Sequence, residues 1–329
     1  MNKFVVFGNG TEWLRYSLND FAALEYKLIQ GTNIFQNNVL NKLMKCHFSL
    51  RANQRFNLPL KSIWYKSICK VISYELDDSP ILIFYDWNVL GYDYNFLKYL
   101  RIYFPNVKLI YIFTNISKVS GARKTNKIDS LSDHYDMVYA FDKSDSVKYG
   151  FREQPLLYSY NIANKLPQSS NVFYIGNAKD RLGMLHKVYK KIESYGLSQD
   201  YYIVGVSEED KINSSIVYNS PISYGEVLKH IESSSCLIDI IQGESEGYTI
   251  KVCEAIFYNK LLITTNERIK DAPFYNSNFI LVIKSENDIP KSFFENASRV
   301  NYSDQDRSYF SINRFIHILE NDLNVGEIM

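Results

Sequence analysis

Two glutamates, Glu246 and Glu254, are separated by seven residues. Glu246 lies in a polar turn, and Glu254 lies in the segment after it, where apolar residues recur at helical spacing. Gly247 follows the first glutamate, and a glycine lets a ligand approach the backbone closely. The amides of Tyr248 and Thr249 would lie at the positive end of the helix, which suits a diphosphate. The second carboxylate could accept hydrogen bonds from two ribose hydroxyls. The spacing therefore indicates a nucleotide-diphosphate site, although an ordinary helix start also favours nearby acidic residues.

The elements that must position these glutamates can be followed along the sequence. The apolar run Cys236–Ile241 predicts a buried strand, and the polar turn 242–247 comes directly after it. Apolar residues at helical spacing then predict a helix that stops at Asn259. Leu261–Thr265 predicts the next strand. Together these segments form a strand–loop–helix–strand unit of a parallel sheet.

The segment 246–255 reads Glu-Gly-Tyr-Thr-Ile-Lys-Val-Cys-Glu-Ala. It resembles the donor-binding motif of the GT-B glycosyltransferases, in the large retaining family whose motif begins with Glu-Gly and ends with Glu-Ala. In that family the second glutamate binds the nucleotide ribose, the first lies near the donor sugar, and the backbone between them holds the phosphates. By resemblance these roles fall on Glu254, Glu246 and Gly247–Thr249. Tyr248-Thr249 replaces the commoner Phe-Gly, and Lys251 replaces a common Pro, which leaves the donor sugar open.

A basic turn follows the predicted strand Val172–Ile175 and precedes another predicted helix. It contains Gly176 and Asn177, and then Lys179 and Arg181. The turn resembles the place where GT-B enzymes put basic side chains on the donor diphosphate. The resemblance implies that role for both basic residues, and a basic surface turn is the alternative interpretation.

The loop after a later predicted strand, Ile216–Tyr218, usually frames the base of the nucleotide in this fold. The resemblance therefore implies base contacts from Tyr218, Pro221 and Ile222. Ser223 has a glutamate three residues later, and this pattern predicts a helix cap rather than a ligand contact.

Strands and helices alternate through the first half, which predicts an α/β domain with a parallel sheet. The strand Phe4–Phe7 ends in a glycine-containing loop, where ligands bind in doubly wound domains, although a plain Asn-Gly turn is equally compatible. A second strand, Ile81–Tyr85, ends at an aspartate. The predicted acceptor contacts are Gly8, Asn9, Gly10 and Asp86.

The resemblance also bears on the catalytic groups. Retaining members generally have no assigned covalent nucleophile, and the departing phosphate can deprotonate the acceptor. An inverting enzyme would need a base from the first domain, for which His134 and Asp86 are candidates; His134 is also compatible with a packed loop histidine. The predicted catalytic residues are Glu246, Lys179, Arg181 and His134.

Charge is distributed unevenly between the two halves. Residues 1–165 hold 21 Lys and Arg against 14 Asp and Glu, and the remainder holds 16 against 22. This asymmetry indicates an anionic partner for the first half. Nucleic acid is not expected, because there is no basic cluster or recognised motif.

One segment of the first half adds a membrane hypothesis. Between Glu25 and Glu75 there are eight basic residues and no acidic one. A predicted helix in this segment carries an apolar stripe, with lysines opposite; the stripe is Leu60, Trp64, Ile68, Val71 and Ile72. Such a helix can lie on an anionic membrane, here through residues 42–72, or can face the domain core.

Other classes of function are disfavoured by the sequence. No apolar run approaches a membrane span, and the N-terminus predicts a strand instead of a signal peptide. The four cysteines and five histidines show no ligand spacing, so we expect no metal site. These features are typical of a cytoplasmic protein, which could also bind peripherally at the inner face of the membrane.

The resemblance thus implies a GT-B α/β fold of two Rossmann-like, doubly wound domains facing across a cleft. The expected divisions are an acceptor domain (1–165), a nucleotide-sugar domain (166–302) and a C-terminal helix crossing back (303–329). The expected function is metal-independent, retaining transfer of a sugar from a nucleotide-sugar to a bacterial polysaccharide or lipopolysaccharide precursor, such as capsule or O-antigen. A nucleotide-sugar epimerase and a non-catalytic nucleotide-sugar-binding protein remain alternatives.

Overall fold

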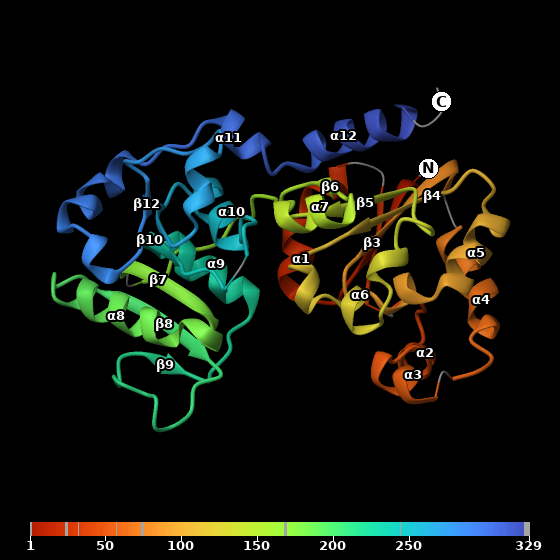
Figure 1. Cartoon of the computed structure of the whole chain (residues 1–329), viewed down its shortest axis with the longest axis horizontal. Coiled ribbons are helices and arrows are strands. Elements are labelled where there is room, and N and C mark those ends of the chain that lie inside the picture. The colour runs from red at the N-terminus through yellow and green to blue at the C-terminus, as the bar shows by residue number, and fades with distance from the viewer. Residues whose placement is uncertain are drawn as a thin grey trace. The chain divides into compact units, whose positions relative to one another are not determined.

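The computed structural model describes residues 2–23, 26–31, 33–56, 58–73, 76–167, 170–243 and 245–325 (Figure 1). The chain forms two compact units. Unit 1 runs from the N-terminus to Leu157 and includes the residues from Phe315 onward, and unit 2 is Tyr158–Arg314. The division after Leu157 lies earlier than the boundary expected after residue 165.

Unit 1 contains a six-stranded parallel sheet in the order β2-β1-β3-β4-β5-β6. The strands are β1 (Asn2–Gly8), β2 (Tyr26–Gln30), β3 (Leu76–Tyr85), β4 (Lys108–Ile112), β5 (Met137–Ala140) and β6 (Arg152–Glu153). The strand order reverses between β1 and β3, and ligands of open parallel sheets bind beyond the carboxyl ends at such a reversal. Gly8 and Asp86 lie at this edge, where β1 and β3 end.

Helices surround this sheet and are α1 (Glu12–Ser17), α2 (Asn38–His47), α3 (Leu50–Phe56), α4 (Ser62–Ile72), α5 (Tyr94–Tyr103), α6 (Gly121–Lys124), α7 (Lys143–Tyr149) and most of α12 (Ile312–Val325) (Figure 1). The central strands are apolar along their length because both faces of the sheet are covered. Phe7 of β1 and Phe84 of β3 stack with ring centroids 4.4 Å apart in this core.

Helix α4 faces the core of unit 1 with Tyr65, Ile68, Cys69 and Ile72. Trp64 is only half-buried, and its indole Nε1 donates a hydrogen bond to His47 Nδ1 at 2.9 Å.

Four residues of the predicted apolar stripe pack on the core, which confirms the core-facing alternative for this helix; they are Trp64, Ile68, Val71 and Ile72. Ile68 and Ile72 pack inside, whereas Leu60 is 71% exposed. The helix also buries Tyr65 and Cys69, which the predicted stripe did not include. Glu25 and Glu75, which bound the acid-free segment, lie outside the described residues.

Unit 2 contains a second six-stranded parallel sheet, in the order β12-β11-β10-β7-β8-β9. The strands are β7 (Ser170–Asn177), β8 (Gln199–Val204), β9 (Val217–Tyr218), β10 (Ser234–Asp239), β11 (Leu261–Thr264) and β12 (Ile280–Val282). This is the Rossmann strand order, and its reversal lies between β7 and β10.

The helices of unit 2 are α8 (Leu182–Glu193), α9 (Tyr224–Ser233), α10 (Ile250–Phe257) and α11 (Asp304–Ser308) (Figure 1). Strand β10, helix α10 and strand β11 are the strand–loop–helix–strand unit predicted from the sequence. Glu244 in its loop, like residues 168 and 169 of the expected linker 161–171, lies outside the described residues.

Candidate functional site

The basic turn after β7 lies at the reversal point of the unit 2 sheet. The Arg181 guanidinium donates to the carbonyl of Asn177 from Nε at 3.1 Å and from Nη2 at 3.0 Å. Its Nη1 donates to the carbonyl of Ile240 at 2.6 Å, just beyond β10. Lys179 Nζ donates to Gln242 Oε1 at 2.5 Å. Both basic side chains therefore connect the loops that follow the two strands on either side of the reversal.

Lys179 and Arg181 differ in how they are held. Lys179 is exposed, whereas Arg181 is half-buried and uses three of its five N–H groups on backbone carbonyls in the described residues. Burial lowers the pKa of Lys179, and the positive charge of Arg181 lowers it further, against an opposing effect of Asp180. A bound anion would relieve this repulsion between the two cations.

Position 176 requires a glycine, because the surrounding atoms leave no room for a side chain. A Cβ atom there would lie 2.7 Å from the Tyr174 hydroxyl and 3.4 Å from Arg181 Nη2. Tyr174 is 2% exposed, and its hydroxyl has no hydrogen-bond partner among the described residues. Burial raises the pKa of Tyr174 to about 12. The sequence analysis did not single out this tyrosine, because it reads as one more apolar residue of a strand.

The start of α10 is fixed by a buried aspartate at the end of β10. Thr249 caps the helix by accepting the amide of Lys251 at 3.2 Å, and donates its hydroxyl to Asp239 Oδ1 at 2.8 Å. Thr264 donates to Asp239 Oδ2 at 3.1 Å. Burial raises the pKa of Asp239, and the two hydroxyl bonds oppose that shift. A polar residue inside the apolar run 236–241 was the available signal for it.

The loop before α10 is held from the side of β11. Gly247 is buried, and its carbonyl accepts a hydrogen bond from Asn266 Nδ2 at 3.1 Å. The Tyr248 ring packs edge-on against Phe274, with centroids 5.2 Å apart. Glu246 forms an ion pair with Arg268, a residue that the sequence analysis did not select.

Glu254 lies in the interior of unit 2, with no exposed surface. Its Oε1 accepts a hydrogen bond from the Tyr224 hydroxyl at 2.9 Å, and its Oε2 pairs with Lys251 Nζ at 2.7 Å. The Tyr224 hydroxyl in turn lies 3.1 Å from that of Tyr158. In this structure the carboxylate therefore holds α10 against α9.

The residues expected at the base follow β9, on the carboxyl edge of the same sheet. The Tyr218 hydroxyl is half-buried and lies 3.1 Å from His186 Nε2. Pro221 is exposed and Ile222 is half-buried. The turn therefore exposes the apolar side chain of Pro221 at the carboxyl edge of the sheet.

In unit 1, the residues expected to contact the acceptor come together where the strand order reverses. Asn88 Nδ2 donates to the carbonyl of Gly8 at 2.7 Å, which joins the loops after β3 and β1. Asn9 Oδ1 accepts the amide of Thr11 at 3.0 Å, and Gly10 has a φ of +84°, a conformation that favours glycine.

Asp86 is at this edge but is completely enclosed. Its Oδ1 accepts hydrogen bonds from the hydroxyls of Tyr92 and Tyr111, each at 2.6 Å, and from the amide of Gly121 at 3.0 Å. Burial raises the pKa of this carboxyl. The side chain thus joins β3, β4 and α6 internally.

His134 lies apart from Asp86, three residues before β5 begins. Its ring packs on Tyr94 with centroids 3.7 Å apart, and its carbonyl accepts a hydrogen bond from Arg101 at 3.1 Å. Burial lowers the pKa of His134, and neighbouring cations, first Lys98, lower it further. These contacts are those of a packed loop histidine.

Within the described ranges, no three His, Cys, Asp or Glu side chains gather as a metal site. Over the same residues, no helix has both the length and the apolar character needed to cross a bilayer.

Solved structures show what the whole fold is similar to, whereas no family model and no curated protein matches the sequence. A trehalose-6-phosphate synthase has a TM-score of 0.59 at 11% identity, over 98% of this chain and 99% of that chain. A sucrose-phosphate synthase from Thermosynechococcus elongatus has a TM-score of 0.52 at 10% identity, over 100% and 98%. An alpha-glucosyltransferase in complex with UDP-glucose and DNA has 0.50 at 12%, over 93% of each chain. The predicted α/β fold with two Rossmann-like doubly wound sheets, of the GT-B type, is confirmed.

The buried pair of Glu254 and Lys251 yields a prediction about stability. We expect Glu254→Gln to lower the free energy of unfolding by about 3 kcal/mol, because it leaves the Lys251 ammonium buried without its counter-charge. Lys251→Met should cost a similar amount, and the double variant should cost less than the sum of the two. Urea unfolding of the three variants measures this coupling.

Glu226 and Lys229 provide the matched control, because they form an ion pair at the same spacing on the surface. Glu226→Gln should cost less than about 1 kcal/mol. Equal effects of the two Glu→Gln changes would contradict the structural role of Glu254.

Proposed function

We propose that this protein is a glycosyltransferase that moves a sugar from a nucleotide-diphosphate sugar to a hydroxyl group. One observation carries the proposal: Lys179, Arg181 and the loop leading to α10 meet at the reversal point of a Rossmann sheet. Ligands of such sheets bind at this point, and helix N-termini bind phosphate. The resemblance of residues 246–255 to a donor motif supports the same assignment.

A UDP-sugar is the first donor to test. Two similar structures involve UDP: the alpha-glucosyltransferase is in complex with UDP-glucose, and a trehalose-phosphate synthase from Burkholderia xenovorans, with a TM-score of 0.52 at 9% identity, is UDP-forming. In this chain the diphosphate would contact Lys179, Arg181 and the amides of Gly247–Thr249, with Gly176 and Asn177 forming the adjacent turn. Tyr218, Pro221 and Ile222 would contact the base.

The two glutamates would act on the sugars of the donor. Glu246, oriented by its ion pair with Arg268, would face the transferred sugar. Glu254 would accept hydrogen bonds from the ribose. Each carboxylate oxygen of Glu254 can accept two hydrogen bonds, and one of these is already used, by Tyr224 or by Lys251. The ribose would use the second position on each oxygen, so it must reach this buried carboxylate without displacing either partner.

The reaction would proceed with retention and without a metal ion. Negative charge develops on the departing diphosphate, and fixed cations and amides stabilise it most effectively when they are already in place. Lys179, Arg181 and the start of α10 would supply that charge. A retaining reaction needs no base from unit 1, where Asp86 is enclosed and His134 packs on Tyr94.

The acceptor would be a bacterial polysaccharide or lipopolysaccharide precursor, bound by unit 1 in the cytoplasm. The loop Gly8–Gly10 supports this assignment, because it lies where the strand order of unit 1 reverses. The positive charge of the first half suits an acceptor linked to a lipid phosphate.

An anionic membrane would bind the surface formed by α2 and the start of α4. His47 joins the two helices, because its ring accepts a hydrogen bond from Trp64 and contacts the Pro59 carbonyl at 2.6 Å. Exposed apolar side chains lie on both helices and are Val39, Leu40, Leu43, Leu60 and Ile63. The described residues 33–73 contain lysines and arginines but no acidic side chain. Such a surface complements anionic lipid headgroups.

Lys179 tests the donor site. We expect Lys179→Ala to weaken UDP binding by about 1–3 kcal/mol, because it removes a charge-assisted contact to phosphate. Arg181→Ala should weaken binding and also stability, because Arg181 bonds two backbone carbonyls. Calorimetric titration with UDP measures the binding, and Lys187→Ala on the exposed face of α8 is the matched control. Equal affinities for Lys179→Ala and Lys187→Ala would place the diphosphate elsewhere.

Turnover tests the reaction itself. UDP release from a UDP-sugar should require an added glycan acceptor and should be unaffected by EDTA, because protein cations stabilise the leaving group. Conversion of the donor without an acceptor would point to an epimerase, and affinity without conversion to a binding protein. Inactivation by EDTA that is reversed by a divalent ion would overturn the metal-independent reaction.

Liposome binding tests the membrane surface. Vesicles with anionic lipid should bind the protein and release it at high salt, because exposed charges are screened over about 10 Å at 0.1 M salt. Leu43→Glu with Ile63→Glu should abolish cosedimentation. The control pair, Ile102→Glu with Val147→Glu, changes apolar residues elsewhere in unit 1 that are even more exposed than Leu43 and Ile63. Wild-type cosedimentation of the first pair would reject this surface.

A further inference from the structure

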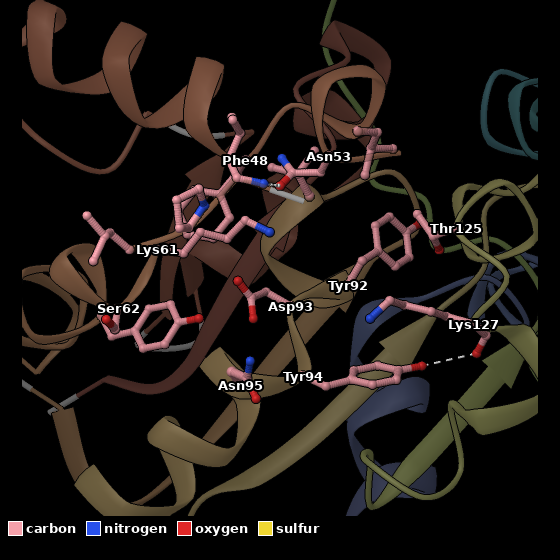
Figure 2. A pocket seen from close by; sticks show the side chains of 16 residues that line it. Phe48, Asn53, Lys61, Ser62, Tyr92, Asp93, Tyr94, Asn95, Thr125 and Lys127 are labelled. Carbon is pink, nitrogen blue, oxygen red and sulfur yellow. Dashed lines mark hydrogen bonds between the residues drawn. The ribbon is translucent and has the colours of Figure 1, made fainter. Parts of the chain in front are cut away.

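Unit 1 contains a cavity of about 770 Å³ beside the reversal point of its sheet. Four segments line it, from α2–α3, the start of α4, the loop after β3 and the loop after α6 (Figure 2). The last two segments follow the carboxyl ends of β3 and β4, which is the edge where parallel sheets bind ligands. None of the acceptor contacts expected from the sequence lines this cavity.

Two lysines, Lys61 and Lys127, enter the cavity from different segments. Each follows a residue with positive φ, Leu60 at +62° and Asn126 at +55°, which turns the chain sharply at that point. Figure 2 shows both ammonium groups directed toward Asp93 in the middle of the cavity. Burial lowers the pKa of Lys127, Asp93 opposes that shift, and the charge of Lys61 lowers the pKa again. The two cations are therefore close enough to repel each other.

Asp93 is the only acidic residue among those lining the cavity. Its Oδ1 accepts the amide of Phe96 at 3.2 Å, which fixes the carboxylate at the start of α5. Burial and then this carboxylate raise the pKa of the Tyr65 hydroxyl. The ionised lining has two positive charges and one negative charge, so it favours an anion and can also accept a hydroxyl hydrogen.

Two tyrosine rings form a rigid wall beside these charges. Tyr92 is held by its bond to Asp86 and packs so tightly on Gly121 that a Cβ there would lie 2.3 Å from the Tyr92 hydroxyl. Tyr94 donates its hydroxyl to the Lys127 carbonyl at 3.1 Å, and the Lys127 ammonium lies 3.8 Å from the centre of its ring (Figure 2). Tyr94 therefore holds the Lys127 side chain in place, through both its ring and its hydroxyl.

We propose that this cavity binds the acceptor and that the acceptor carries a phosphate group. Lys61 and Lys127 hold the phosphate, and Asp93 accepts a hydrogen bond from a sugar hydroxyl. This inference rests on the proposed glycosyltransferase function. In the transfer, the acceptor oxygen bonds to the anomeric carbon of the donor, the bond from that carbon to the diphosphate breaks, and the hydroxyl proton passes to the departing diphosphate.

The same chemistry fits a soluble sugar phosphate and a lipid-linked one, so the test uses both. The probes are glucose 6-phosphate, a polyisoprenyl-phosphate-linked sugar in micelles, and glucose as the neutral control. We expect calorimetric titration to detect one phosphorylated probe with an affinity about tenfold or more above that for glucose. The probe that binds identifies the source of the phosphate.

The variant Lys61→Ala with Lys127→Ala should lower that affinity about tenfold or more. Lys98→Ala with Lys143→Ala, two exposed lysines of unit 1 outside the cavity, should leave it unchanged. Absence of binding for both phosphorylated probes, or equal affinities for the two lysine pairs, overturns the proposal.

UDP titration of the same proteins separates this inference from the function on which it rests. The cavity variant should bind UDP as the wild type does, because its substitutions lie in unit 1 and the donor residues in unit 2. Normal UDP binding without dependence of probe binding on Lys61 and Lys127 rejects the cavity alone. A wild-type protein that binds no UDP or UDP-sugar rejects the proposed function.

Discussion

Both units depend on the geometry of a parallel sheet whose strand order reverses once. All strands of such a sheet end at the same edge, and the connections on either side of the reversal leave to opposite faces. The loop backbones there lack ladder partners and must be satisfied by side chains. In unit 2 the Arg181 guanidinium bonds the carbonyls of residues 177 and 240. In unit 1 the Asn88 amide bonds the carbonyls of Gly8 and Gly31.

A buried aspartate stands at the corresponding place in each sheet. Asp86 follows β3 and Asp239 ends β10, and each of these strands lies directly across the reversal from the first strand of its unit. Burying a carboxylate is unfavourable unless it is hydrogen-bonded, and each aspartate accepts two hydroxyl bonds. Through those hydroxyls, Asp86 orients Tyr92 in the cavity wall and Asp239 orients Thr249 at the start of α10. A buried aspartate that accepts hydroxyl hydrogen bonds therefore positions the cavity wall in unit 1 and the start of α10 in unit 2.

The two surfaces differ in the chemistry that their loops add. Unit 2 presents cations that repel each other next to the start of a helix, which suits the charged part of a nucleotide-sugar. Unit 1 presents a cavity with two lysines and one carboxylate, which suits a substrate with an anion and hydroxyls. This division of chemistry agrees with a protein that handles two dissimilar substrates.

The sequence by itself determined the local elements: the apolar runs and helical spacing predicted β10, α10 and β11, and the alternation of strands and helices predicted the α/β class. Local patterns are sufficient there because strand burial and helix amphipathicity repeat along the chain.

Only the tertiary structure decided which polar side chains are enclosed. Glu254 lies in the interior because Tyr224 and Lys251 reach it from α9 and from its own helix, and Asp86 is enclosed by residues far from it in sequence. It also decided that α4 buries Tyr65 and Cys69 beside the predicted stripe, and that Lys61 and Lys127 share a cavity. Such contacts depend on how segments distant in sequence pack together. The periodicity of apolar residues along one segment does not indicate which other segments will pack against it.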